Sequence, residues 1–243
     1  MDNVEHQPRP PRHAALLTPP VGFAHRGARA HAQENTLEAF ALAVKLGATG
    51  LESDVYVTAD ESPVLDHDGV VGSVFRRKPI SEVQRSELPS HVPSLPELYE
   101  TVGSDLDLSL DIKDPAAFEA TVEAARNAGA EAKLWLCHPS IEQLIQWRTQ
   151  TTARLVNSPG RVRIEEGLEP RAARLADAGI DALNRPAKDW NAGQVALLHR
   201  FGRLALGWDA QQHRQITSVI DMGIDGFFSD HVDRMTECLA QFF

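Results

Sequence analysis

Two carboxylates stand two residues apart in the stretch from Gly50 to Asp68, which reads GLESDVYVTADESPVLDHD. Alternate side chains of an extended strand share one face, so Glu52 and Asp54 point the same way, roughly 6 to 7 Å apart along the backbone. Carboxylates this close repel each other unless a cation lies between them or one is protonated. A hard divalent ion such as Mg²⁺ or Ca²⁺ prefers oxygen ligands and would relieve the repulsion. An isolated pair of this kind more often belongs to the solvent-exposed face of a strand. The residues around Glu52 and Asp54 therefore decide whether a metal site is indicated.

Other residues capable of chemistry also follow short apolar runs. His25 and Arg26 end the run that starts at Val21, and His67 and Asp68 end a run just beyond the two carboxylates. Imidazole titrates near neutral pH and can donate or accept a proton. The sequence therefore indicates acid–base groups close to the carboxylate pair along the chain.

A third strand, LDLSLDIK, alternates strictly from Leu106 to Lys113. Its leucines and isoleucine face one way, and its polar residues, which include Asp111, face the other. Buried charges on such a strand are costly unless they are paired or bound to a metal. We expect the apolar side to contact helices and the charged side to face a site.

The elements that must position these residues follow a regular order. Eight strands are expected at 21–27, from about 50, and at 106–113, 133–138, 153–157, 182–184, 203–208 and 226–229. Helices are expected at 37–46, 94–102, 115–128, 140–149, 165–178, 191–201 and 211–222, with a last one closing the chain. Strand–helix repeats of this spacing predict a single (β/α)8 TIM barrel over residues 21–243, with a doubly wound open sheet as the alternative.

Two segments depart from this repeat. Residues 1–20 are rich in proline and are expected to form an extended N-terminal tail. The stretch 69–93 is too long for a simple connection and predicts a short excursion after the second strand, over one end of the barrel.

In a barrel of this kind, charged residues at the C-terminal ends of strands mark the active site.

Taken in order, these motifs resemble the glycerophosphodiester phosphodiesterases, enzymes with a (β/α)8 barrel. The resemblance rests on His25-Arg26-Gly27, Glu34-Asn35-Thr36, Glu52-x-Asp54, Pro63-Val64-x-x-His67-Asp68 and Asp111-x-Lys113, with GIDGFFSD at 223–230 similar to the family's last strand. It spans about residues 21–230. Each piece alone is weak, whereas the ordered combination is specific.

The resemblance implies a divalent metal ion, Mg²⁺ or Ca²⁺, with Glu52, Asp54 and Asp111 as its ligands. The third ligand of the family is usually a glutamate, and Asp111 is one methylene shorter. All three ligands offer oxygen, which suits a hard ion.

The resemblance also implies that Arg26 and Lys113 bind the phosphate and that His25 and His67 form the acid/base pair. Trp208 is expected to stack on substrate carbons. The family's W-T-x-N run reads Trp208-Asp209-Ala210-Gln211 here, which changes the polar contacts of that loop. The excursion is also shorter than usual, so we expect a more open leaving-group side.

Some polar residues near these motifs have weaker assignments. Asp68 is expected to orient the loop and His67, and Glu34 to be a loop charge with a possible role near the metal or the glycerol. His138 could be a substrate contact or a structural histidine. Asp209 and Asp230 have no assigned role.

Three functions are compatible with these residues. The first is metal-dependent hydrolysis of glycerophosphodiesters to sn-glycerol 3-phosphate and an alcohol. The alternative is a phospholipase D-like enzyme acting on lysophospholipids or sphingomyelin, a branch that Asp111-x-Lys113 resembles somewhat better. A catalytically dead ligand-binding barrel should have lost a histidine or a carboxylate, and neither is lost.

Composition narrows the partners and the setting. The net charge of −10 argues against a general electrostatic grip on nucleic acid or on an anionic membrane. It does not exclude the small-molecule glycerophosphodiester substrate that the resemblance implies, because a bound metal inverts the charge locally. Cys137 and Cys238 are too few for a disulfide framework, and the N-terminus lacks an apolar run of signal-peptide length. We therefore expect a cytoplasmic protein without stable membrane insertion, and the sequence leaves the oligomeric state open.

Overall fold

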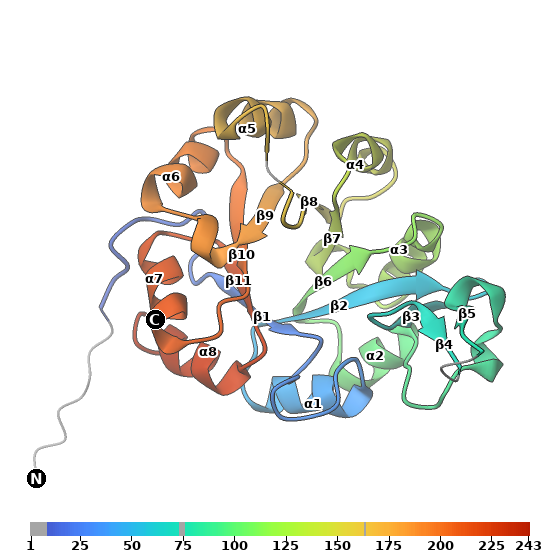
Figure 1. Ribbon diagram of the computed structural model, residues 1–243. Coiled ribbons are helices and arrows are strands. Elements are labelled where there is room, and N and C mark those ends of the chain that lie inside the picture. The colour runs from blue at the N-terminus through green and yellow to red at the C-terminus, as the bar shows by residue number, and fades with distance from the viewer. Residues whose placement is uncertain (1–8, 73–75, 163) are drawn as a thin grey trace, which may run out of the picture.

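In a computed structural model that describes residues 9–72, 76–162 and 164–243, eight parallel strands surround a central axis (Figure 1). The barrel strands are β1 (Val21–His25), β2 (Gly50–Val57), β6 (Asp107–Ile112), β7 (Leu134–His138), β8 (Arg154–Asn157), β9 (Ala182–Pro186), β10 (Leu204–Trp208) and β11 (Gly226–Ser229). Strand β1 pairs in parallel with both β2 and β11, so the sheet closes on itself. The predicted TIM barrel is confirmed, and the open sheet is wrong.

Helices cover the outside of the barrel, one after each barrel strand, as Figure 1 shows. The described part of the chain forms α1 (Leu37–Lys45), α2 (Leu95–Val102), α3 (Ala117–Asn127), α4 (Ile141–Arg148), α5 (Leu168–Asp177), α6 (Ala192–Arg200), α7 (His213–Asp221) and α8 (Val232–Leu239). Thr36 caps α1, because its side-chain oxygen accepts a hydrogen bond from the Ala39 amide. Helix α3 begins at Ala117 rather than at the predicted Pro115, since the Asp114 carboxylate binds the Ala116 amide just before the helix.

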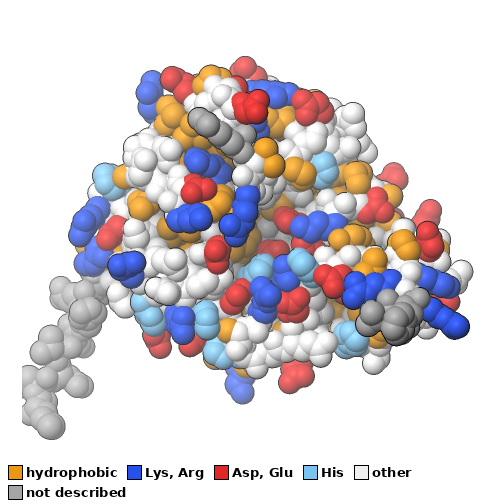
Figure 2. Space-filling view, in the orientation of Figure 1, with side chains coloured by type: hydrophobic (Ala, Val, Ile, Leu, Met, Phe, Trp, Pro, Cys, Tyr) orange, Lys and Arg blue, Asp and Glu red, His pale blue; other side chains and the backbone are white. Residues whose placement is uncertain are grey.

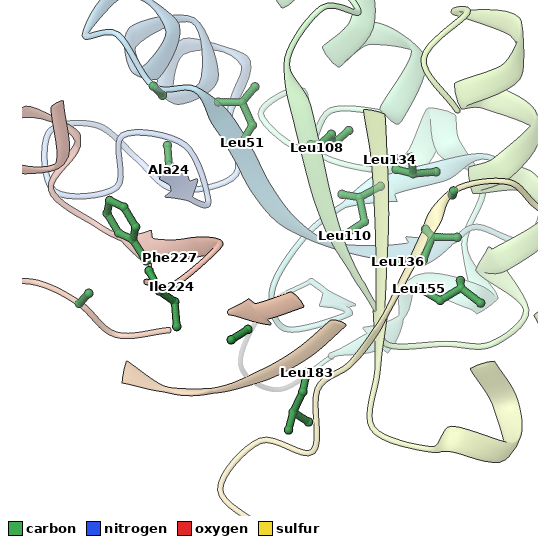
Figure 3. Close-up of a cluster of buried hydrophobic side chains, with 14 of the residues drawn as sticks. Ala24, Leu51, Leu108, Leu110, Leu134, Leu136, Leu155, Leu183, Ile224 and Phe227 are labelled. Atoms are coloured by element: carbon green, nitrogen blue, oxygen red, sulfur yellow. The ribbon is translucent and has the colours of Figure 1, made fainter. Parts of the chain in front are cut away.

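Apolar side chains alternate between the two faces of the barrel wall. The outer face packs against the helices, and Figure 3 shows this layer, with Leu108 and Leu110 of β6 beside Leu134 and Leu136 of β7. The inner face is filled by a second cluster, consisting of Phe23, Trp135, Cys137, Val156, Ala182, Leu206 and Phe228. The same period of two directs the polar residues near the strand ends inward, above this inner layer.

The excursion after β2 contains its own small elements. Strand β3 (Pro63–Leu65) pairs antiparallel with β2, and β4 (Val70–Val71) pairs antiparallel with β5 (Lys78–Pro79). Two short 3-10 helices follow, η1 (Ile80–Glu82) and η2 (Arg85–Glu87). Further 3-10 turns precede β7, as η3 (Glu131–Lys133), and follow β9, as η4 (Ala187–Asp189). The excursion has a separate apolar core made of Val64, Ile80, Val83, Leu88 and Val92.

Residues 9–20 lie against the N-terminal end of the barrel, opposite the strand ends that carry the polar residues. The Asp225 carboxylate accepts hydrogen bonds from the Leu16 and Leu17 amides, at 2.7 and 3.0 Å, and the Leu17 side chain packs on the inner apolar cluster. Arg9 forms an ion pair with Asp221 at 2.8 Å. The first eight residues of the predicted tail lie outside the described residues.

Candidate active site

A cavity of about 610 Å³ opens at the C-terminal ends of the barrel strands. Figure 2 shows this hollow at the centre of one face, with basic, acidic and histidine side chains around it. Seven of the eight predicted site residues line it, namely His25, Arg26, Glu52, Asp54, Asp111, Lys113 and Trp208. The structure thus brings together residues from strands β1, β2, β6 and β10 that lie far apart in the sequence.

A tight turn after β1 sets the position of the first two residues. Arg26 has φ 52° and Gly27 has φ 78°. A Cβ atom at Gly27 would lie 2.7 Å from the Ala39 backbone, so the turn needs glycine there. In this turn the Arg26 amide donates to the Glu52 carboxylate at 2.9 Å.

Positive side chains lie among the carboxylates. The Lys113 ammonium is 2.8 Å from Asp54 Oδ1 and 3.0 Å from Asp111 Oδ2. Arg26 Nε lies 3.5 Å from Asp54 Oδ2, and neither of these two atoms has a hydrogen-bond partner in the described chain. Asp54 is only 2% exposed, so an unsatisfied carboxylate oxygen points into a nearly closed environment.

This arrangement fits a hard divalent cation. Burial, together with the nearby charge of Asp54 and Asp111, raises the pKa of Glu52 to about 7, against the opposing effect of His25. Burial also raises the pKa of Asp54 despite the adjacent Lys113. In the described chain, the ligand oxygens of Glu52, Asp54 and Asp111 do not all lie within 4.8 Å of one another. The Lys113 ammonium contacts both Asp54 and Asp111. Buried, mutually repelling carboxylates with a free oxygen are the donor set that Mg²⁺ or Ca²⁺ would satisfy.

Glu52→Gln is expected to stabilise the metal-free protein in a pH-dependent way. Because the folded-state pKa of Glu52 is raised, the stability that its protonated form contributes to the fold is fully present below the ordinary pKa near 4.5. This stability is lost as the pH rises through about 7. At pH 8 in excess chelator the variant should melt higher than wild type by on the order of 5 °C, and the gap should shrink towards pH 5. A difference in melting temperature of equal size at both pH values, measured by circular dichroism, would show that ionisation of the buried Glu52 does not destabilise the fold.

His25 is held by a residue to which the sequence assigned no role. Its Nδ1 lies 2.6 Å from the Asp230 carboxylate, and its Nε2 lies 3.8 Å from Glu52. Burial lowers the pKa of His25, but the charge of Glu52 and the hydrogen bond to Asp230 outweigh this effect and raise it. Asp230 directly follows β11, so its place after a barrel strand was the signal that could have found it.

His67 is not among the residues that line the cavity. Strand β3 ends at Leu65, and the Asp66 carboxylate then accepts hydrogen bonds from the amides of Asp68 and Gly69, which turns the chain. The His67 side chain is 44% exposed, and its Nδ1 lies 2.9 Å from the Asp68 carboxylate. Asp68 thus contacts His67 in the way expected of an orienting residue.

The remaining wall of the cavity comes from further strand ends and from loops. Trp208 packs partly on the inner apolar cluster, and the Arg161 guanidinium lies 5.2 Å from its ring centre. Arg29 forms an ion pair with Glu34, which also accepts from Arg26 at 2.9 Å. Neither Arg29 nor Arg161 was predicted, because isolated loop arginines carry no periodic signal.

His138 also lines the cavity, and its ring meets that of Trp147 edge to face at 5.1 Å. Burial lowers the pKa of His138. Its location is compatible with both of the roles that the sequence left open.

A closed (β/α)8 barrel with charged residues gathered at the C-terminal ends of its strands is the architecture of a barrel enzyme. Residues 25–234 match the model of the glycerophosphoryl diester phosphodiesterase family. The chain belongs to this family, and it is a glycerophosphodiester phosphodiesterase, a phosphoric diester hydrolase.

Known proteins resemble the chain over most of its length. The protein named probable glycerophosphodiester phosphodiesterase 2 of Mycobacterium tuberculosis is 26% identical, with 90% of each chain covered. The glycerophosphodiester phosphodiesterase of Thermotoga maritima has the same fold, with a TM-score of 0.77, 22% identity and 93% and 99% of the two chains covered. A phosphodiesterase of Oleispira antarctica, solved with the product sn-glycerol-3-phosphate, has a TM-score of 0.78, 20% identity and 91% and 97% covered.

Proposed function

We propose that the enzyme hydrolyses glycerophosphodiesters to sn-glycerol 3-phosphate and an alcohol, with a divalent metal ion and two histidines. The observation that carries this proposal is the convergence of a predicted acid/base histidine, the predicted metal ligands and the predicted phosphate-binding residues on a single cavity, namely His25, Glu52, Asp54, Asp111, Arg26 and Lys113. The resemblance to a phosphodiesterase solved with sn-glycerol-3-phosphate supports the choice of product.

Glu52, Asp54 and Asp111 would hold the ion. When bound, a divalent cation lowers the pKa of a coordinated hydroxyl and neutralises charge on the phosphate oxygens. The protein's own cations add to this. Burial lowers the pKa of Lys113, but Asp111 and Asp54 outweigh it and raise the pKa, so the ammonium stays charged to meet a phosphate. Arg26, whose side chain is mostly buried, supplies a planar donor group beside it.

The two histidines are held in the same way. In each ring Nδ1 faces a carboxylate, that of Asp230 for His25 and that of Asp68 for His67. A carboxylate accepts a hydrogen bond from Nδ1–H, which leaves Nε2 to exchange a proton with the substrate. His25 would serve inside the cavity, and His67 would serve from the turn after β3.

A glycerophosphodiester carries a hydroxyl next to its phosphoryl group, and we propose that this hydroxyl is the nucleophile. One histidine removes the proton of this hydroxyl as the hydroxyl oxygen attacks phosphorus. The other histidine protonates the alcohol oxygen as the P–O bond to the alcohol breaks. Water then opens the cyclic phosphate with the histidine roles reversed. Intramolecular attack gains from an effective concentration on the order of 10⁵ M or more.

The proposed route predicts that diesters without the adjacent hydroxyl are poor substrates. We expect kcat/KM for glycerophosphocholine to exceed that for its deoxy analogue, matched in every other respect, by about a thousandfold or more. Lysophosphatidylcholine, assayed beside them, tests the phospholipase D-like alternative. Equal kcat/KM for the matched pair would favour direct attack by water, and faster turnover of the lysophospholipid would favour the alternative.

A further inference from the structure

A second cluster of metal-binding side chains lies outside the active-site cavity. It consists of His31, His231 and Asp233, whose ligand atoms all lie within 4.8 Å of one another. None of the three lines the cavity. Figure 2 shows histidine side chains gathered on the surface near α8, apart from those in the central hollow.

Backbone contacts bring the three residues together from the two ends of the barrel sequence. His31 belongs to the loop between β1 and α1, where its amide donates to the Ala28 carbonyl at 2.8 Å. His231 and Asp233 stand at the start of α8, and the His231 amide donates to the Ser229 hydroxyl at 3.2 Å. The Ala30 amide donates to the Asp230 carbonyl at 3.2 Å, which joins the two segments directly.

Their side chains already face one another. His31 Nε2 lies 3.0 Å from the Asp233 carboxylate, and the two imidazole rings meet edge to face at 6.3 Å between centres. Donor atoms around a tetrahedral zinc ion sit about 3.4 Å apart, given metal–ligand distances of about 2.0–2.1 Å. Small side-chain rotations would therefore let all three residues bind one ion.

We propose that His31, His231 and Asp233 form a zinc site. Two imidazole nitrogens and one carboxylate oxygen are a donor set that selects Zn²⁺ over Mg²⁺ and Ca²⁺, in contrast to the all-oxygen set of Glu52, Asp54 and Asp111. His31 is exposed, so the ion reaches the site from solvent and keeps water as its remaining ligand.

An ion at this site would tie together two segments that shape the active-site cavity. One segment carries Arg26 and Arg29, and the other carries Asp230, the residue next to His231 that holds His25. Binding to the folded state alone raises its stability by RT ln(1 + L/Kd), where L is the free ion concentration. The site is therefore a clamp between the β1–α1 loop and the β11–α8 turn.

The test is a calorimetric titration of the full chain with Zn²⁺ in the presence of excess Mg²⁺. We expect one equivalent to bind wild type, with affinity reduced at least about tenfold in His31→Ala and in His231→Ala. His213→Ala is the matched control, because His213 pairs with Glu237 at 2.8 Å on the surface and belongs to no such cluster within the described residues. Co²⁺ should give a visible absorption band in wild type and the control that both cluster variants lack.

Equal Zn²⁺ affinity in wild type and the two cluster variants would overturn the proposal, as would the absence of saturable binding. Loss of binding in Glu52→Gln but not in His231→Ala would also overturn it, by placing the ion in the cavity. Because the readout is binding and absorbance, the result is independent of whether the proposed phosphodiester chemistry is correct.

Discussion

His25→Ala should lower kcat by about a hundredfold to ten-thousandfold, the scale of lost general acid–base help. The ring sits in the cavity, with Nδ1 bound to Asp230 and Nε2 3.8 Å from the Glu52 carboxylate. Its removal leaves the phosphate-binding cations in place, so KM should change much less than kcat. Steady-state kinetics with glycerophosphocholine checks the expectation.

His67→Ala should lower kcat on the same scale, although His67 does not line the cavity. His213→Ala, on the exposed surface of α7, is the control and should keep wild-type turnover. Circular dichroism should show unchanged folding in all three variants. Near-native turnover in both His25→Ala and His67→Ala would make the acid/base assignment wrong, whereas loss in the first alone would remove only the role of His67.

Exhaustive chelation should abolish turnover, and Mg²⁺ or Ca²⁺ should restore it. The buried Asp54 has an oxygen without a hydrogen-bond partner in the described chain, beside two further carboxylates, so the site needs more positive charge than Lys113 and Arg26 supply. Asp54→Asn should lower activity by at least about a hundredfold, and added ion should not rescue it. The measurement is activity against the concentration of free divalent ion.

Asp60→Asn serves as the control for this variant, since Asp60 lies in the turn after β2 and does not line the cavity. Its activity should depend on the ion as that of wild type does. Full wild-type activity after exhaustive chelation would contradict the metal-dependent account.

The strand pattern of the sequence predicted most of the fold. Strict alternation in β6 indicated that Leu108 and Leu110 pack against helices and that Asp111 faces inward, and the structure confirms both. The same alternation predicted that Glu52 and Asp54 share one face of β2, and both line the cavity. Residues on strands are predictable in this way because the period of two fixes their direction once the barrel closes.

Residues held by loops were harder to predict. Arg29 and Arg161 reach the cavity through loop conformations that no sequence period reports. His67 follows a short strand outside the barrel, and its position depends on the Asp66 turn. Asp230 was missed because its significance depends on contact with His25, more than 200 residues away in the chain.

The most direct test of the account is phosphorus NMR of glycerophosphocholine during turnover with Mg²⁺. Cleavage of the bond between phosphorus and the choline oxygen should yield sn-glycerol 3-phosphate, alone or after a transient cyclic phosphate. His25→Ala should show the same product at a greatly reduced rate. Phosphocholine as the phosphorus-containing product would contradict the account, because the opposite P–O bond would then have been broken.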